Sequence, residues 1–155
     1  MKQLEFDERR ERLFRDYEEL VTRPNEPIED TNGVVQRWKY PVLTADHAPP
    51  FWRYDLDPVT NPYLMERIGI HSAFNPGAIE VDGKCFLMAR VEGTDRKSFF
   101  GLAESSTGID GFRFRDRPVV MPETSDPDVN VYDLSLIHIS EPTRPAPLSR
   151  MPSSA

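Results

Sequence analysis

Cysteine is almost absent from this sequence, and so is any long hydrophobic run. Cys85 is the only cysteine among 155 residues, so no internal disulfide can form, and we expect a protein of the reducing cytoplasm. The longest apolar runs, such as residues 85–89, fall far short of the roughly 20 residues that span a bilayer. The strongly charged N-terminal stretch also differs from a secretory signal peptide. We therefore expect no membrane partner.

The chain also has no net positive charge, and it contains only three histidines. The formal net charge is −7 at pH 7, whereas a nucleic-acid partner would need a basic face that this composition does not suggest. His47 and His71 lack the spacing of metal ligands, so we expect no metal. The sequence also lacks a phosphate loop, a dinucleotide fingerprint and a nucleophile elbow, so we expect no cofactor. A few Arg and Lys side chains can still hold phosphate, because the local field matters more than the net charge.

What the sequence does contain begins with an amphipathic helix over residues 6–21. Its apolar residues fall on one stripe at helical spacing; they are Phe6, Leu13, Phe14, Tyr17, Leu20 and Val21. Pro24 and Pro27 end the helix because proline lacks the backbone donor that a helix requires. This apolar face could pack against the rest of its own subunit, against another subunit, or against both. Residues 1–27 form one unit of helix and turn.

The remaining globular sequence, residues 28–134, has strand patterns. Residues 28–62 combine turn formers and aromatics, which predicts short strands joined by ordered loops. The pair Asp82-Gly83 between residues 77–81 and 84–91 predicts a β-hairpin, and further strands are predicted over 98–103 and 112–115. The fold class is therefore all-β with an N-terminal helix. Successive antiparallel strands are typical of one propeller blade, with a sandwich as the alternative.

The segment 135–155 differs from everything before it. It contains four prolines, five serines and no glycine, and it has no sustained period with which to bury a face. Residues 134–145 resemble the translation of a sequencing adapter read into an open frame. We expect 135–155 to be a non-native, disordered tail, with a genuine disordered terminus as the alternative.

A small set of polar residues could carry chemistry. Asp133 follows an Asn-Val-Tyr run typical of a strand, and a carboxylic acid at a strand end in a partly dry cleft can donate a proton. A turn cap or surface carboxylate is the alternative. Arg96, Lys97 and Asp95 form a polar loop that either presents donors to sugar hydroxyls or is a solvated turn with a salt bridge.

Two further residues lie next to aromatic side chains. Asn75 belongs to a Phe-Asn-Pro-Gly turn, where its amide could face a cleft or bridge the turn backbone. Arg53 lies between Trp52 and Tyr54, so it could reach substrate or stack on an aromatic neighbour. The rings of Trp52 and Tyr54 could stack on a sugar, or they could be packed in the core of the protein.

Four runs of residues carry a resemblance to a known family. They are Phe-Trp-Arg-Tyr at 51–54, Phe-Asn-Pro-Gly at 74–77, Arg-Val-Glu-Gly-Thr-Asp-Arg-Lys at 90–97 and Asn-Val-Tyr-Asp at 130–133. With them, the stretch from the first helix to residue 134 resembles the mannosyl phosphorylases of glycoside hydrolase family 130, in particular those acting on mannosyl-glucose.

The resemblance implies roles for individual residues. Asp133 would be the general acid, since it occupies the acidic position of the Asn-Val-Tyr-Asp motif. Arg96 and Lys97 would contribute to the mannose subsite, with Asp95 as their orienting partner. Asn75 and Arg53, the two remaining candidates, would also contact substrate.

The resemblance also implies a reaction. Inorganic phosphate, the co-substrate, would attack the anomeric carbon of a β-mannosyl unit with inversion and release glucose and α-mannose 1-phosphate. Ordinary inverting glycosidases need a second carboxylate to activate water, whereas phosphate is already anionic and one acid suffices. The proton would pass through the 3-hydroxyl of the mannose. The alternatives are phosphorolysis of β-1,4-mannooligosaccharides and a carbohydrate-binding propeller without turnover.

The fold implied by the resemblance is a five-bladed β-propeller with its site on the axis. This chain would hold the helix, the first blade and the start of the second, and the residues that bind phosphate would lie downstream. We therefore expect an inactive fragment of a homo-oligomeric glycosyltransferase of the hexosyltransferase class.

Overall fold

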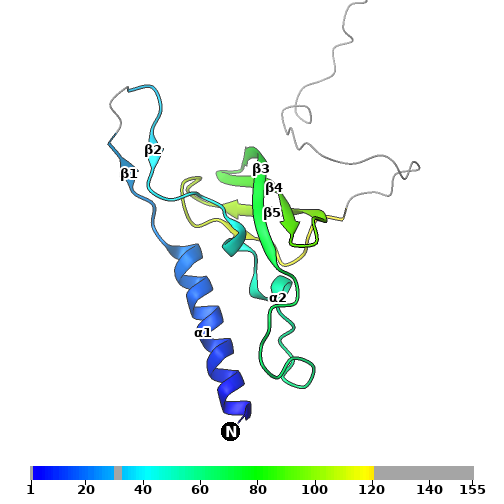
Figure 1. Cartoon of the computed structure of the whole chain (residues 1–155). Helices are drawn as coiled ribbons and strands as arrows, with labels where there is room; N and C mark the ends of the chain where they lie inside the picture. The colour runs from blue at the N-terminus through cyan, green and yellow to red at the C-terminus, as the bar shows by residue number, and fades with distance from the viewer. Residues whose placement is uncertain (1, 30–32, 121–155) are drawn as a thin grey trace, which may run out of the picture.

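A computed structural model describes residues 2–29 and 33–120 and contains mainly β-structure after one long helix (Figure 1). The elements are α1 (Lys2–Thr22), β1 (Pro27–Ile28), β2 (Arg37–Trp38), the 3₁₀ helix η1 (Ala45–His47), α2 (Pro50–Arg53), β3 (Ile70–Val81), β4 (Lys84–Gly93), β5 (Ser98–Ser105) and β6 (Arg113–Phe114). The predicted class, β-structure with an N-terminal helix, is confirmed.

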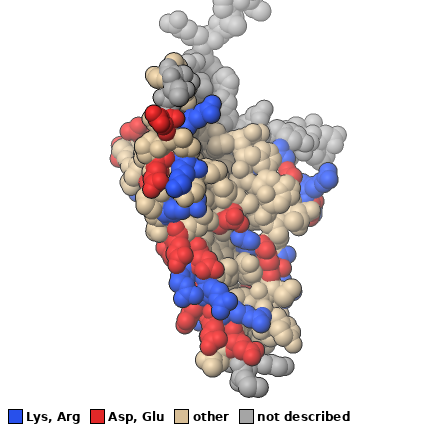
Figure 2. All heavy atoms as spheres, turned by 60° about the vertical axis from the view of Figure 1, so that its left-hand side comes forward, with Lys and Arg blue, Asp and Glu red and all other residues tan. Residues whose placement is uncertain are grey.

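Helix α1 packs against its own chain through the predicted stripe. Phe6 and Val21 are each 1% exposed, and the stripe residues between them are half-buried. The helix contacts η1 and α2, and its outward face carries interleaved acidic and basic side chains (Figure 2). The first of the two predicted uses of the stripe, packing within the subunit, is therefore confirmed.

Strands β3 to β6 form a four-stranded antiparallel sheet in chain order. Asp82 and Gly83 both have positive φ, 52° and 73°, as a type I′ hairpin turn requires, so the predicted hairpin is confirmed. Strand β3 begins earlier than predicted, at Ile70, and continues through the segment predicted as a turn. There the register with β4 shifts between Phe74 and Gly77. The prediction of a turn at 74–77 was wrong, because the segment lies inside β3 and forms a β-bulge there.

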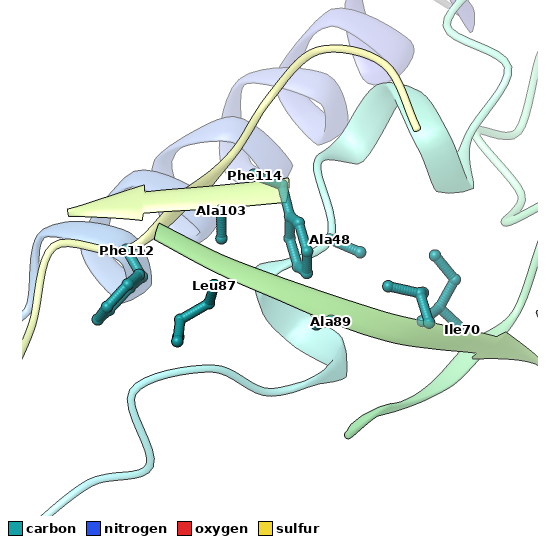
Figure 3. Close-up of a cluster of buried hydrophobic side chains, with 8 residues drawn as sticks. Ala48, Ile70, Leu87, Ala89, Ala103, Phe112 and Phe114 are labelled. Atoms are coloured by element: carbon teal, nitrogen blue, oxygen red, sulfur yellow. The ribbon is translucent and has the colours of Figure 1, made fainter. Parts of the chain in front are cut away.

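The core lies on one face of this sheet (Figure 3). It contains Ala48, Ile70, Leu87, Ala89, Val91, Ala103, Phe112 and Phe114. Trp52 of α2 packs on this face, with its ring centroid 5.5 Å from that of Phe99 and 5.3 Å from that of Phe114. Its Nε1 donates to the Asp116 carbonyl oxygen at 2.7 Å. Trp52 is half-buried and packs against the core, while its use as a sugar platform stays a prediction.

The short helices η1 and α2 correct the expectation of strands and loops alone over 28–62. Proline at the first position of a helix costs no hydrogen bond, and Pro50 begins α2 in this way. The predicted short strands also exist, since β1 and β2 pair as a separate two-stranded ribbon beyond the end of α1 (Figure 1).

Asn25 joins the end of α1 to two distant loops. Its Nδ2 donates to the carbonyl oxygens of Tyr40 at 2.9 Å and Ile109 at 3.0 Å, and its Oδ1 accepts the Tyr40 backbone N–H at 3.0 Å. Its own backbone N–H is bound by the Asp110 carboxylate at 3.1 Å. Each polar atom of the Asn25 side chain therefore has a partner. These bonds fix the chain after α1 to the loops that contain Tyr40 and Ile109.

Candidate functional site

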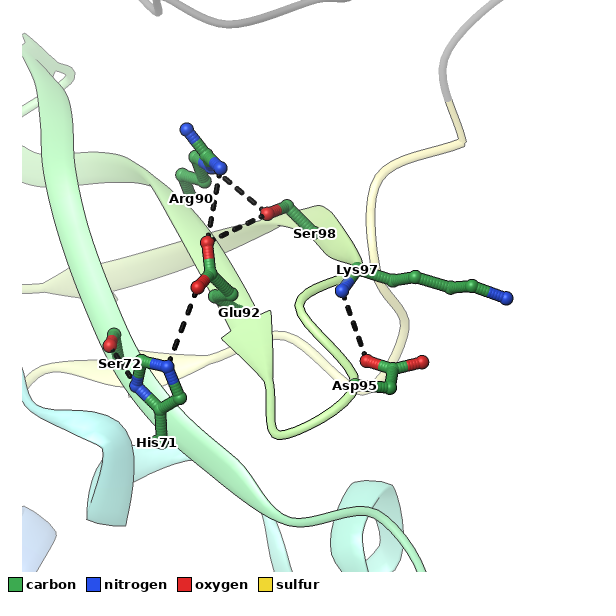
Figure 4. A network of polar contacts seen from close by, with 7 residues as sticks. All are labelled: His71, Ser72, Arg90, Glu92, Asp95, Lys97 and Ser98. Carbon is green, nitrogen blue, oxygen red and sulfur yellow. Dashed lines mark hydrogen bonds and ion pairs between the residues drawn. The ribbon is translucent and has the colours of Figure 1, made fainter.

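A network of polar side chains joins β3, β4 and β5 near one end of the sheet (Figure 4). The Glu92 carboxylate accepts from Arg90 Nη2 at 3.1 Å and lies 3.4 Å from His71 Nε2. Ser98 Oγ donates to the same carboxylate at 3.4 Å and accepts from Arg90 Nε at 3.0 Å. Ser72 Oγ contacts His71 Nδ1, so both ring nitrogens of this histidine have partners. Glu92 is the centre of the network.

Strand alternation and register place these side chains together. Ala89 and Val91 are fully buried in the core. Successive side chains of a strand point to opposite faces, so the alternate residues Arg90 and Glu92 project from the other face of the sheet. Glu92 pairs with Ser72 of β3 and with Ser98 of β5, and directly opposed residues share a face. The Glu92 side chain is 18% exposed, so its carboxylate lies mainly among these partners and not in solvent.

The bulge segment, residues 74–77, adjoins this network. The Arg90 guanidinium lies 4.9 Å from the centre of the Phe74 ring, within the range of a cation–π contact. Asn75 has φ of 48°, in the left-handed region that asparagine tolerates better than most residues. Bulges re-aim side chains out of the regular strand pattern, which suits a residue predicted to contact a ligand.

The turn segment, residues 93–98, holds three of the predicted site residues. Asp95 Oδ1 accepts the Lys97 backbone N–H at 3.0 Å, and Arg96 donates its backbone N–H to the Gly93 oxygen at 3.0 Å with a φ of 63°. Asp95 therefore orders the backbone of the turn. The side chains of Arg96 and Lys97 are exposed, and Lys97 extends away from the Glu92 network in Figure 4.

Arg53 lies on α2 and binds within the chain. Its Nε donates to Glu66 Oε1 at 2.6 Å, and its Nη1 lies 4.0 Å from Asp46 Oδ1. The guanidinium is 5.6 Å from the centre of the Tyr54 ring, so the predicted stacking on an aromatic neighbour is present. A role of Arg53 in substrate binding stays a prediction.

Asp133 lies outside the described residues, as do the predicted tail and the start of a second blade. Within the described ranges, no group of three or more His, Cys, Asp or Glu side chains is placed to hold a metal ion. No helix in the same part of the chain is both long and apolar enough to cross a bilayer.

Glu92 and His71 are the residues that sequence reasoning undervalued. Glu92 belongs to the run at 90–97, and the order of residues in that run does not show what its carboxylate contacts. The register of the two hairpins would have predicted the network. When β4 is paired with β3 and with β5, Glu92 lies directly opposite Ser72 on one side and Ser98 on the other.

The comparisons with known proteins give a relationship for the chain. No protein-family model matches it. Over 131 residues, which make up 84% of the chain, it is 55% identical to the 4-O-beta-D-mannosyl-D-glucose phosphorylase of Bacteroides fragilis. The resemblance to mannosylglucose phosphorylases is confirmed. The chain spans about a third, 34%, of the length of that phosphorylase.

The relationship to this phosphorylase covers most of the site described above. A match over 131 of the 155 residues must include β3 and β4, because the unmatched residues at the two ends are too few to reach either strand. The bulge segment, the turn segment and the Glu92 network therefore lie in the part of the chain that is similar to this phosphorylase.

Proposed function

We propose that this chain contributes to an inverting phosphorylase. The reaction converts 4-O-β-D-mannosyl-D-glucose and inorganic phosphate into α-D-mannose 1-phosphate and D-glucose. The observation that carries the proposal is the 55% identity over 131 residues to a phosphorylase named for this disaccharide. In this proposal the protein acts in the cytoplasm as a hexosyltransferase of glycoside hydrolase family 130, without a cofactor, as a homo-oligomer.

Asp133 is the general acid in this proposal. A phosphate oxygen attacks the anomeric carbon of the mannose from the face opposite the leaving group, and the glycosidic carbon–oxygen bond breaks. The Asp133 proton reaches the departing glucose oxygen through the mannose 3-hydroxyl, so the glucose leaves neutral. One acid is sufficient because the attacking phosphate oxygen already carries negative charge.

The exposed polar side chains of the described part supply the sugar subsite. Arg96 and Lys97 lie at the turn segment beyond the end of β4, and Asn75 lies at the bulge segment, opposite the middle of β4 and joined to the Glu92 network through Phe74. Guanidinium, ammonium and amide groups donate to sugar hydroxyls, and a turn ordered by Asp95 presents them with little loss of entropy. Arg53 is a further substrate contact in the proposal.

The proposed fold of the complete enzyme is a five-bladed β-propeller in which β3 to β6 form the first blade. A four-stranded antiparallel sheet in chain order supports this arrangement, since each blade of a propeller has that form. The phosphate-binding residues lie outside this chain in the proposal.

Activity of a hybrid enzyme tests the function. Residues 1–133 of this chain replace the matching part of the Bacteroides fragilis phosphorylase, and the hybrid is incubated with mannosyl-glucose and phosphate. We expect α-mannose 1-phosphate, identified by the anomeric signal in a phosphorus and proton NMR spectrum. A correctly folded hybrid that binds mannosyl-glucose but forms no product would favour the carbohydrate-binding alternative.

The acceptor preference is tested with the same hybrid. Mannosyl-glucose and β-1,4-mannobiose are compared at equal concentration, because the two substrates differ in the sugar that leaves. The name of the relative favours mannosyl-glucose. A higher kcat/KM for β-1,4-mannobiose would establish the mannooligosaccharide alternative instead.

A further inference from the structure

The Glu92 network contacts both segments that carry predicted sugar-binding side chains. Arg90 lies over Phe74, the first residue of the bulge segment, at 4.9 Å. Ser98 is the last residue of the turn segment and is bound by both Arg90 and Glu92. The network therefore forms a continuous path of contacts from the bulge segment to the turn segment across three strands.

We propose that Glu92 is a positioning residue that fixes the bulge segment relative to the turn segment. The Glu92 carboxylate would thereby set the distance between Asn75 on the bulge segment and the two cationic residues, Arg96 and Lys97, on the turn segment. This inference rests on the proposed function, because it assigns to those side chains a common sugar ligand. Glu92 itself touches no substrate in this account and acts through Arg90 and Ser98.

The negative charge of Glu92 is what the arrangement requires. Charge-assisted hydrogen bonds are roughly twice as strong as neutral ones, and the Arg90 side chain is only 20% exposed. A neutral amide at position 92 keeps the size of the side chain but removes the negative charge that lies 3.1 Å from the guanidinium. His71 adds a further constraint, since its Nε2 faces the carboxylate while its Nδ1 faces Ser72.

Glu104 provides a matched control on the same sheet. It pairs with Phe86 across β4 and β5, and its carboxylate binds Lys84 Nζ at 3.2 Å and Arg115 Nη2 at 3.2 Å. Like Glu92, it thus joins cationic side chains of neighbouring strands. It lies toward the other end of β4, so its loss leaves the bulge and turn contacts in place.

The first test measures hydrogen–deuterium exchange in the full chain carrying Glu92→Gln or Glu104→Gln. We expect Glu92→Gln to raise exchange at least about threefold in both the bulge and the turn segments, because local opening follows the loss of local contacts. Glu104→Gln leaves both segments as in the unsubstituted chain. Glu92→Asp, which keeps the charge, restores part of the protection.

Two results of the exchange experiment would overturn the inference. One is unchanged exchange in both segments of Glu92→Gln. The other is an equal rise in all strands, which would show that Glu92 contributes only to overall stability.

The second test uses the kinetics of the hybrid enzyme. We expect Glu92→Gln to lower kcat/KM for mannosyl-glucose about ten- to hundredfold through a raised disaccharide KM, since a small misplacement of binding groups has effects of this size. The KM for phosphate stays the same, because phosphate binds elsewhere in the proposal. Equal changes in both KM values, or none, would contradict the positioning role. An inactive unsubstituted hybrid would instead overturn the proposed function, and the exchange experiment would still decide the role of Glu92.

Discussion

His47 is a buried histidine whose neutral ring caps a short helix. It is 5% exposed, and its Nδ1 accepts the Thr44 backbone N–H at 3.1 Å, which a protonated ring nitrogen cannot do. Burial lowers the pKa of His47 below its ordinary value of 6.5, the positive charge of Arg23 lowers it further, and Asp46 opposes both. Folding therefore favours the unprotonated ring.

Stability of the chain should consequently fall in mild acid. Because the folded pKa of His47 lies below 6.5, the unfolded chain binds the proton more readily, so the stabilisation is complete above pH 6.5 and is lost as pH falls below it. Urea unfolding at pH 7.5 and pH 5.5 measures the effect. His47→Gln should show a smaller difference between the two pH values, and an identical pH dependence of both proteins would contradict this account.

Arg90 and Glu92 show how residues of one strand divide between two tasks. Their buried neighbours Ala89 and Val91 form the core, while these two charged residues connect the strands on the opposite face. Removing the charge of Arg90 or Glu92 is thus expected to loosen the segments around it. Changing the side-chain volume at Ala89 or Val91 is expected to disturb the packing of the core.

At the scale of elements, α1 is held to the sheet by an ion pair with two hydrogen bonds. Arg113 of β6 donates to Glu18 through Nη1 at 2.9 Å and Nη2 at 2.6 Å. The hydrogen bond from Arg113 lowers the pKa of the Glu18 carboxyl, so its contribution is present at neutral pH and is lost as pH falls through that lowered pKa.

Removing this pair should have a small effect, because both side chains are partly exposed, 41% for Arg113 and 54% for Glu18. We expect Glu18→Gln to cost about 0.5–1 kcal/mol of unfolding free energy at pH 7. Glu19→Gln, the neighbouring exposed carboxylate on α1, is the control and should cost less. Urea unfolding compares the two, and equal losses would show that the contact with β6 contributes nothing specific.

The packing of α2 on the sheet depends on a glycine of β5. A Cβ added at Gly101 would lie 2.6 Å from Phe114 Cε1 and 3.2 Å from Trp52 Cη2, closer than packed carbon atoms approach. The absence of a side chain at this position allows the indole ring to lie against the strand.

We expect Gly101→Ala to destabilise the chain by about 1–3 kcal/mol through overpacking. Adding Phe114→Leu removes the nearest ring atoms, so the double variant should lose less than the sum of the two single variants. Thermal unfolding of all four proteins gives the coupling. Simple additivity would mean that the strand moves away from the ring at no cost.

At the scale of the whole molecule, sequence patterns predict what is local. The period of α1, the hairpin at Asp82-Gly83 and the buried pair Phe112 and Phe114 follow from spacing alone. The bulge at residues 74–77 does not, because Pro and Gly there equally suit a free turn. The Glu92 network needs the register of three strands, which no single strand determines.

The chain by itself should not turn over substrate. It spans 34% of the length of the related phosphorylase, and the proposal places the phosphate-binding residues outside it. We expect no mannose 1-phosphate above background from the 155-residue chain with mannosyl-glucose and phosphate. Measurable product would show that the chain holds its own phosphate site.

Phosphorolysis by the hybrid enzyme carrying Asp133→Asn tests the central claim most directly. An amide cannot deliver the proton that the leaving glucose needs, so kcat should fall about a hundredfold or more while mannosyl-glucose still binds. Product formation at the unsubstituted rate would contradict the account, because the acid of the proposed reaction would then be another residue.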